Sequence, residues 1–308
     1  MVMLHEHGRE PADLRKRTSL ANLSTNQAAT TLDLGGDLTV RRLGFGAMRI
    51  TGPEIWGEPA DHDEAIATLR RAVELGVNVV DTADSYGPFV SDRLIAEALH
   101  PYAEDLVIAT KGGMTRSGPS RWGTDGRPQH LRAACDESLQ RLRLEQIPLY
   151  QFHRPDPTVP FEDSVGMLAE LKNEGKVRHI GLSNVTETQL DQAMRLTPIV
   201  SVQNRYSPAD RSSEAIVDRC ESESLAFLPW GPVEQGAIGG DAAVERVAKK
   251  HGATAHQVAL AWLLARSPMM LPIPGTGSVA HVEENMQAAT LRLSPEEVAE
   301  LNTRGRVM

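Results

Sequence analysis

The chain has 308 residues, of which 41% are hydrophobic, so it is long enough for one large domain with a sizeable core. Its formal net charge is -9, which argues against a general nucleic-acid binder because there is no basic excess to neutralise phosphates. No apolar run approaches the roughly 18 residues that a membrane-spanning helix needs, so we expect no membrane association.

The N-terminal region, residues 1–28, is polar and has no apolar segment typical of a secretory signal. We therefore predict a polar tail over 1–28, one domain over 29–308, and a cytoplasmic location. The two cysteines, Cys135 and Cys220, are too few for a disulfide framework and lack the spacing of metal ligands, so we predict reduced thiols and no metal site.

A β-hairpin is predicted at the start of the domain. Hydrophobic residues alternate on both sides of Gly35-Gly36, and a Gly-Gly pair suits a two-residue turn. Beyond the hairpin, short apolar runs alternate with helical patterns. The predicted strands are 42–48, 77–83, 106–111, 149–153, 178–184, 199–204, 225–231 and 270–276.

The helical patterns between these runs have clear ends. Helices over 61–76 and 160–175 both stop at a glycine, and Thr254 and Ser294 are suited to begin two later helices as N-caps. Eight strands alternating with helices predict an α/β fold, a (β/α)8 TIM barrel with an N-terminal β-hairpin. A doubly wound sheet is the alternative, but the G-x-G-x-x-G fingerprint does not follow the first strand.

The ends of the predicted strands carry polar side chains that can do chemistry. Asp81, Lys111 and His153 end the second, third and fourth strands, and Tyr86 lies in the loop after Asp81. In such barrels the catalytic residues come from the carboxyl ends of the strands, so we expect these four to converge on one rim. A tyrosine, with an ordinary pKa of about 10, is a poor acid near neutrality.

The ammonium group of Lys111 would favour the phenolate and lower the pKa of Tyr86, and Asp81 would supply the counter-charge for Lys111. His153 would position a carbonyl oxygen. The set therefore suits proton donation to an oxygen that becomes negative, as in carbonyl reduction by hydride from a cofactor. Two other hypotheses stay open. One is an unrelated barrel enzyme, either a phosphate-binding isomerase or an aldolase that forms a Schiff base on Lys111; the other is a cofactor-binding regulatory subunit with little turnover.

Eight motifs in order give the sequence a resemblance to a known family. They are "LGFGAM", "VDTADSYG", "IATKGG", "QFHRPD", "IGLSNV", "VQNRYS", "LPWGPV" and "IPGTGS…EEN". From about residue 30 onward the sequence resembles the aldo-keto reductase family, and most of all its bacterial pyridoxal reductase-type group. The resemblance implies an NADP-dependent oxidoreductase with Asp81, Tyr86, Lys111 and His153 as catalytic tetrad. Its specific alternative is a pyridoxal reductase, or pyridoxine 4-dehydrogenase.

The resemblance also implies that NADPH, with NADH as the alternative, lies across the barrel mouth. Trp230 matches the position of the aromatic residue that stacks on the nicotinamide ring. Gly275 and His281 stand where many members have a lysine and an arginine for the 2′-phosphate, which leaves Thr276, Ser278 and backbone N–H groups for that role. The implied cofactor-binding residues are Gly46, Ala47, Met48, Asp81, Ser183, Asn184, Gln203, Trp230, Gly231, Pro232, Gly275, Thr276, Ser278, His281, Glu284 and Asn285.

The expected partner is a small-molecule carbonyl substrate, and the protein is expected to be a monomer or a weak homo-oligomer. Tyr86 and His153 would meet the reacting carbonyl group. Loop residues Trp56 and Trp122 would shape the pocket, and Arg154 or Arg121 would orient an acidic or phenolic group of the substrate.

Overall fold

The computed structural model describes residues 30–232 and 241–303. Residues 1–28, the predicted tail, lie outside the described residues, so the division into tail and domain stays a prediction. The predicted hairpin is present: β1 (Thr31–Leu34) pairs antiparallel with β2 (Leu38–Arg41). The predicted two-residue turn is wrong, because Leu34 pairs with Leu38 and the turn includes Asp37. The Asp37 carboxylate accepts hydrogen bonds from Arg178, which holds it in the turn.

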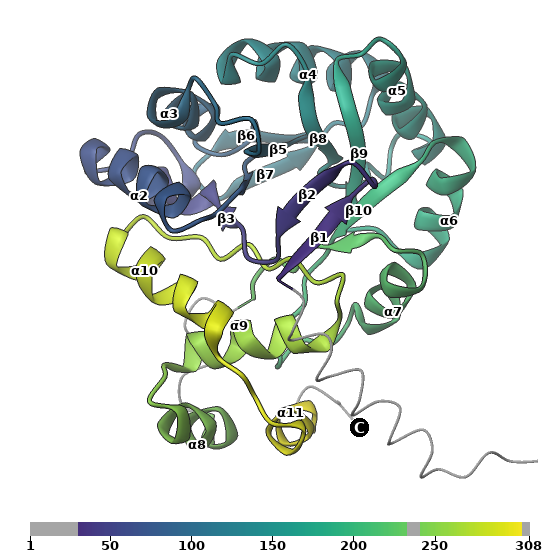
Figure 1. Cartoon of the computed structure of the whole chain (residues 1–308). Helices are drawn as coiled ribbons and strands as arrows, with labels where there is room; N and C mark the ends of the chain where they lie inside the picture. The colour runs from purple at the N-terminus through teal and green to yellow at the C-terminus, as the bar shows by residue number, and fades with distance from the viewer. Residues whose placement is uncertain (1–29, 233–240, 304–308) are drawn as a thin grey trace, which may run out of the picture.

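The central sheet is parallel and curls into a barrel. Within the described residues it contains seven strands in the order β11-β10-β9-β8-β5-β4-β3. Figure 1 shows helices around the outside of this sheet and the β1–β2 hairpin lying across its centre. The strands are β3 (Phe45–Gly46), β4 (Val79–Asp81), β5 (Val107–Gly112), β8 (Ile147–Phe152), β9 (Val177–Ser183), β10 (Ile199–Gln203) and β11 (Ala226–Phe227).

The first and seventh predicted strands are shorter than expected. β3 covers only two residues of 42–48, and a short 3-10 helix, η1 (Ala47–Ile50), follows it at once. β11 likewise covers two residues of 225–231. Beyond β3 the backbone turns into η1. Beyond β11 it stays bonded to the β10 segment, through Leu228 N–H to Val202 O (2.8 Å) and Trp230 N–H to Asn204 O (3.1 Å).

The eighth predicted segment, 270–276, is not a regular strand but closes the barrel. Pro272 and Pro274 have no N–H, so they cannot form a two-way ladder with their neighbours. Their carbonyl groups still accept hydrogen bonds. The bonds to the two flanking strands are Gly44 N–H to Pro272 O (2.9 Å), Gly46 N–H to Pro274 O (3.2 Å) and Leu271 N–H to Phe227 O (2.8 Å). The predicted (β/α)8 barrel is therefore confirmed, with an irregular eighth member.

The helices begin and end as their sequences predict. Thr254 and Ser294 are N-caps, each in a capping box with a residue three positions later, Gln257 and Glu297. The helices are α2 (His62–Glu74), α3 (Val90–Leu99), α4 (Pro128–Leu142), α5 (Phe161–Asn173), α6 (Glu187–Leu196), α7 (Glu214–Ser222), α8 (Ala242–His251), α9 (Ala255–Arg266), α10 (Val279–Gln287) and α11 (Pro295–Asn302).

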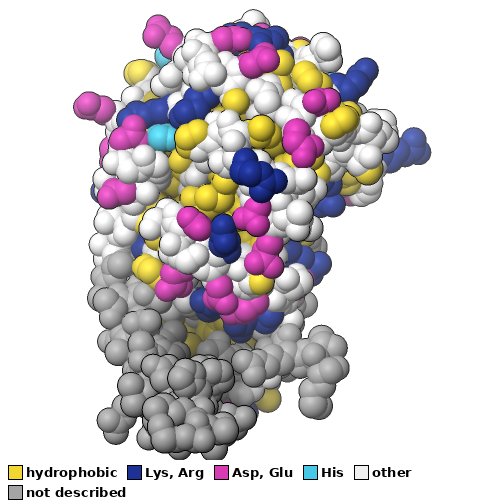
Figure 2. Space-filling model, turned by 90° about the vertical axis from the view of Figure 1, so that its right-hand side faces the viewer, with side chains coloured by type: hydrophobic (Ala, Val, Ile, Leu, Met, Phe, Trp, Pro, Cys, Tyr) yellow, Lys and Arg dark blue, Asp and Glu magenta, His cyan; other side chains and the backbone are white. Residues whose placement is uncertain are grey.

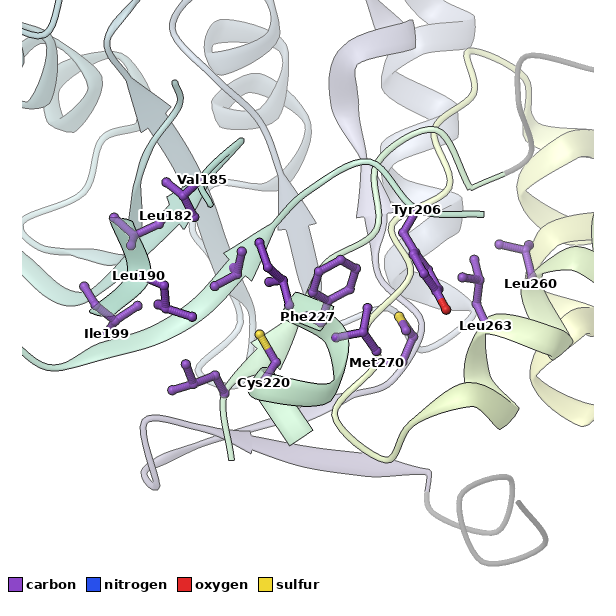
Figure 3. Packing of buried hydrophobic residues seen from close by; sticks show 14 of the residues in the cluster. Leu182, Val185, Leu190, Ile199, Tyr206, Cys220, Phe227, Leu260, Leu263 and Met270 are labelled. Carbon is purple, nitrogen blue, oxygen red and sulfur yellow. The ribbon is translucent and has the colours of Figure 1, made fainter. Parts of the chain in front are cut away.

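The buried hydrophobic residues of the described chain form three clusters, two between the sheet and the outer helices and one inside the barrel. Figure 3 shows part of the larger outer cluster, where Phe227 packs near Cys220 and Met270. The inner one fills the barrel and includes Leu32 and Leu34 of the hairpin, together with Val79, Val107, Ala109, Leu149, Ala226 and Leu271. The hairpin therefore closes one end of the barrel and leaves the carboxyl ends of the strands for a site.

Among the described residues on the side seen in Figure 2, acidic and basic side chains are interspersed, and neither sign of charge forms a face of its own. In the part of the chain that the structure describes, no helix is long and apolar enough to cross a membrane. Cys135 and Cys220 are free and buried, and burial raises the pKa of each thiol to about 12. Both thiols are therefore protonated and unreactive near neutral pH.

The hairpin turn offers a matched pair of substitutions. Gly35 and Gly36 both have positive φ (62° and 82°), which disfavours a side chain. A Cβ at Gly35 would lie 2.2 Å from His179 Cε1, whereas a Cβ at Gly36 would meet nothing within 4 Å. We expect Gly36→Ala to lower the free energy of unfolding by ~1 kcal/mol through backbone strain alone. Gly35→Ala should lower it by a further ~1–3 kcal/mol because His179 must move.

Urea unfolding followed by circular dichroism measures both free energies. His179 is the sensitive partner because it is buried and its Nε2 lies 2.6 Å from Asp37 Oδ1. Equal losses for the two variants would contradict the packing argument.

Candidate active site

Lys111 and Asp81 form a buried ion pair at the centre of the barrel mouth. They lie on the adjacent strands β5 and β4, both are buried, and Lys111 Nζ is 2.6 Å from Asp81 Oδ2. The ammonium group also donates to Thr82 O (2.8 Å) and contacts the Tyr86 hydroxyl at 3.3 Å. Burial lowers the pKa of Lys111, but Asp81 and Tyr86 outweigh burial and the pKa is raised. Lys111 is therefore a charged, fully paired group.

Tyr86 lies in the turn that follows β4. Its N–H donates to Ala83 O (3.1 Å), and the turn brings the phenol back over Lys111. The net pKa shift differs from the one predicted. Burial raises the pKa of Tyr86 above its ordinary value, and the Lys111 ammonium, which acts in the predicted direction, only partly offsets burial. Tyr86 is therefore protonated at neutral pH and has a proton to give.

His153 directly follows β8 and faces Tyr86. The two rings meet edge to face with their centroids 5.9 Å apart, and Ser85 Oγ lies 3.5 Å from His153 Nδ1. Burial, with the charges of Lys111 and Arg154, holds the pKa of His153 well below its usual value. The imidazole is therefore neutral at pH 7, which suits a hydrogen-bonding partner of an oxygen atom and not an acid.

A residue that the sequence analysis missed also holds Asp81. Gln151 Nε2 and Gln203 Nε2 both donate to Asp81 Oδ1 at 2.9 Å. The carboxylate thus accepts Lys111 on one oxygen and two amides on the other. Gln151 stands two positions before His153, and residues two apart on a strand share a face. A polar side chain on the same face of the strand as His153 could have indicated that Gln151 belongs to the site.

The predicted nicotinamide-binding residues form a continuous chain of hydrogen bonds beside His153. Asn184, whose φ is +57°, donates from Nδ2 to His153 O (3.0 Å), and Ser183 Oγ donates to Gln203 O (2.7 Å). Trp230 Nε1 donates to Asn184 Oδ1 (3.1 Å). The structure therefore brings a hydroxyl, two amides and a flat ring to one edge, which is the chemistry that a carboxamide on an aromatic ring needs. Gly231 and Pro232 follow Trp230 directly in the chain.

The segment from Gly275 to α10 differs from an open phosphate site. The N–H of Ser278 donates to Thr276 Oγ1 (3.2 Å), and Thr276 Oγ1 lies 3.3 Å from His281 Nδ1. The N–H of Val279 donates to the carboxylate of Glu64 at 2.9 Å. Part of the helix N-terminus is therefore occupied by groups of the chain itself, one of them an anion.

The other residues predicted to bind the cofactor lie in two places, around Gly46 and on α10. Gly46 and Gly275 lie against each other: a Cβ on Gly275 would lie 2.5 Å from Gly46 O. Ala47 and Met48 follow Gly46 in η1. Glu284 Oε1 accepts a hydrogen bond from Thr254 Oγ1 (2.7 Å), and Asn285 is half-buried in α10.

The predicted pocket residues lie on two loops and on the β6–β7 hairpin; the prediction that Trp122 is a loop residue is wrong. Trp56 forms a β-bridge with Gly87, the residue after Tyr86, so it is close to the phenol. Trp122 lies on β7 (Arg121–Thr124), which pairs with β6 (Met114–Gly118), and it is 39% exposed. Arg154, next to His153, and Arg121 are exposed.

The charge state of Lys111 separates the chemical alternatives. A lysine that forms a Schiff base must lose its proton, which burial without a counter-ion promotes. Here Asp81 and Tyr86 raise the pKa of Lys111. The geometry thus disfavours a Schiff-base aldolase and supports proton transfer at the Tyr86 hydroxyl.

The comparisons with known sequences cover most of the chain. The profile of the Aldo/keto reductase family matches residues 42–304. An uncharacterised oxidoreductase of Schizosaccharomyces pombe is 47% identical over 272 residues, covering 88% of this chain and 89% of that protein. The pyridoxine 4-dehydrogenase of Escherichia coli is 42% identical over 274 residues, covering 87% of this chain and 96% of that protein.

The comparisons with solved structures agree. A thermostable aldo-keto reductase in complex with the inhibitor epalrestat superposes with a TM-score of 0.80 at 30% identity, covering 89% of this chain and 98% of that one. An aldo/keto reductase of Klebsiella pneumoniae in complex with NADP and acetate has a TM-score of 0.76 at 25% identity, covering 89% and 94%.

Proposed function

The chain belongs to the aldo/keto reductase family of oxidoreductases, and from this we propose that it reduces a small aldehyde or ketone to an alcohol, with hydride from NADPH and a proton from Tyr86. The observation that carries the proposal is the buried cluster in which the Tyr86 hydroxyl lies 3.3 Å from the ammonium of Lys111, itself paired with Asp81. Such a cluster stabilises a phenolate as it forms.

The chain's own groups have distinct roles in this reaction. Neutral His153 and protonated Tyr86 would donate hydrogen bonds to the carbonyl oxygen of the substrate. As negative charge grows on that oxygen, Tyr86 transfers its proton, and Lys111 stabilises the phenolate that remains. Asp81, fixed by two amides, keeps Lys111 charged and in place. The nicotinamide, when bound, supplies the hydride.

Ser183, Asn184 and Gln203 would hold the nicotinamide carboxamide, and Trp230 would lie against its ring. The NADP complex of the structurally similar Klebsiella protein supports a nicotinamide cofactor. The adenosine end would lie along Gly275 to Asn285. We favour NADPH over NADH, although the Glu64 carboxylate at Val279 N–H faces the position proposed for the 2′-phosphate.

The substrate that we propose is pyridoxal, reduced to pyridoxine. The E. coli relative, named as a pyridoxine 4-dehydrogenase, supports this choice. Trp56 and Trp122 provide flat surfaces for an aromatic ring, and Arg154 is exposed beside His153, where it can orient a phenolic oxygen.

The proposal is tested by steady-state oxidation of NADPH and of NADH with a panel of carbonyl compounds. The panel includes pyridoxal, a nitrobenzaldehyde, sugars, keto-steroids and small aldehydes. We expect turnover with activated aldehydes, the highest kcat/KM for pyridoxal, and a higher kcat/KM with NADPH than with NADH. Tight NADPH binding without turnover across the panel would contradict the proposal and favour a regulatory subunit. Equal kcat/KM values with the two cofactors would overturn the NADPH preference alone.

A further inference from the structure

Arg116 occupies an unusual position beside the candidate active site. It lies on β6, directly opposite Trp122 in the β6–β7 register. Its guanidinium carbon is 3.7 Å from the centroid of the Trp122 ring and 5.4 Å from that of Trp56. A planar guanidinium stacks well on an aromatic face, so the two predicted pocket tryptophans are joined by one arginine.

The same guanidinium binds backbone carbonyl groups of three separate segments. Arg116 Nη1 donates to Ile55 O at 2.8 Å and to Ser85 O at 3.4 Å. Arg116 Nη2 donates to Glu54 O at 3.1 Å and to Gly118 O at 3.4 Å. The fixed, planar fork of an arginine can serve several carbonyls at once, whereas the single nitrogen of a lysine cannot reach them in this arrangement.

The loop that Arg116 binds is strained. Glu54 and Ile55 both have positive φ (55° and 58°), although neither is a glycine. Two such residues in a row cost ~1–2 kcal/mol each, and the conformation persists only where the surroundings impose it. The Arg116 bonds to both carbonyls are part of what imposes it.

The strained loop continues into the turn that carries Tyr86. Ile55 O accepts a hydrogen bond from the N–H of Gly87 (3.3 Å) as well as from Arg116, and the N–H of Gly57 donates to Gly87 O (2.5 Å). Ser85, whose carbonyl group Arg116 binds, lies next to His153. Tyr86 therefore lies between Ser85, which Arg116 binds directly, and Gly87, which is connected to Arg116 through Ile55 O.

We propose that Arg116 is a positioning residue: it locks the Trp56 loop to the Tyr86 turn and so sets the place of the Tyr86 hydroxyl relative to the substrate carbonyl. Arg116 touches no reacting atom in this role. The inference rests on the proposed function, in which Tyr86 is the proton donor.

The test is the kinetics of Arg116→Lys and Arg116→Ala. Arg116→Lys keeps the charge and loses the fork, so kcat for aldehyde reduction should fall roughly 10- to 100-fold, as for a small misplacement of a catalytic group. KM for the aldehyde should rise, because Trp56 loses its support. The dissociation constant of NADPH, measured by quenching of tryptophan fluorescence, should change less than about two-fold, since the cofactor residues lie on other strands.

Arg93→Ala is the matched control. Arg93 binds Glu58, at the end of the same loop, but through an exposed ion pair between side chains. An exposed pair of this kind contributes little. Loss of this ion pair should leave kcat and KM within about two-fold of the parent. The control therefore tests whether loosening the loop elsewhere is enough to lower kcat.

Two further readouts separate positioning from a general loss of structure. Guanidinium ion added at low millimolar concentration should restore part of the kcat of Arg116→Ala and should not affect Arg93→Ala. In a Tyr86→Phe background, Arg116→Lys should add much less to the loss than it does alone, because both changes act on one proton transfer. A folded Arg116→Lys protein with parental kcat, or equal effects in both backgrounds, would overturn the inference. A fully active Tyr86→Phe protein would instead overturn the proposed function.

Discussion

Tyr86→Phe is expected to lower kcat for carbonyl reduction by about 10²–10⁴-fold, which is the usual contribution of general acid catalysis. The change removes the hydroxyl that lies 3.3 Å from Lys111 and leaves the ring, which packs edge to face on His153. The cofactor residues on the other strands are untouched. The dissociation constant of NADPH should therefore stay close to that of the parent protein.

Single-turnover kinetics with NADPH and an activated aldehyde measure this effect on the chemical step, and fluorescence titration measures cofactor binding. Tyr102→Phe is a suitable control, because its hydroxyl donates to Leu142 O (2.7 Å), at the end of α4 and away from the barrel mouth. If Tyr86→Phe keeps more than about a tenth of the parental rate, the assignment of Tyr86 as proton donor fails.

Lys111→Met is expected to damage both activity and stability. It leaves Asp81 buried without its counter-ion, a change that typically lowers the free energy of unfolding by about 3–5 kcal/mol. Lys176→Met breaks an ion pair with Asp136 that is only partly buried, and it should cost less than about 1 kcal/mol. Adding Asp81→Asn to Lys111→Met should recover part of the stability, because the unpaired charge is removed.

The activity of Lys111→Met carries a second signature in its pH dependence. Lys111 lowers the pKa of Tyr86 against the effect of burial, so its removal raises that pKa further. Alcohol oxidation requires the phenolate as base, and its rate should therefore rise only at a higher pH than in the parent protein. Urea unfolding measures the stability, and the pH profile of alcohol oxidation measures the shift. An unchanged profile would show that Lys111 does not tune Tyr86.

The main features of the site could be predicted because parallel strands all end on the same side. Asp81, Lys111 and His153 could be placed together from the ends of three apolar runs, without any knowledge of distances. The direction of the net pKa shift of Tyr86 could not be predicted, because it depends on how fully the turn buries the phenol. The role of Arg116 could not be predicted, because it depends on the β6–β7 hairpin that follows β5. The hairpin brings Arg116 close to the backbone of Glu54 and Ser85.

In the fold, too, features set by neighbouring residues could be predicted, and features set by residues far apart in the sequence could not. The apolar run at 270–276 correctly indicated an extended segment, but its two prolines cannot donate, so Pro272 and Pro274 only accept hydrogen bonds from Gly44 and Gly46. The Gly35-Gly36 pair correctly indicated a turn. The length of that turn was set by Asp37, through its contacts with Arg178 and His179, which are distant in sequence.

The closing segment also constrains the order in which the protein can be completed during synthesis. β3 and the segment around Pro272 lie near opposite ends of the described chain, and they are hydrogen-bonded to each other. Until the ribosome has released that segment, β3 has an uncovered edge, and contacts of such long range form slowly. The edge of β3 therefore stays open to chaperones that bind strand edges until the segment around Pro272 emerges, close to the end of synthesis.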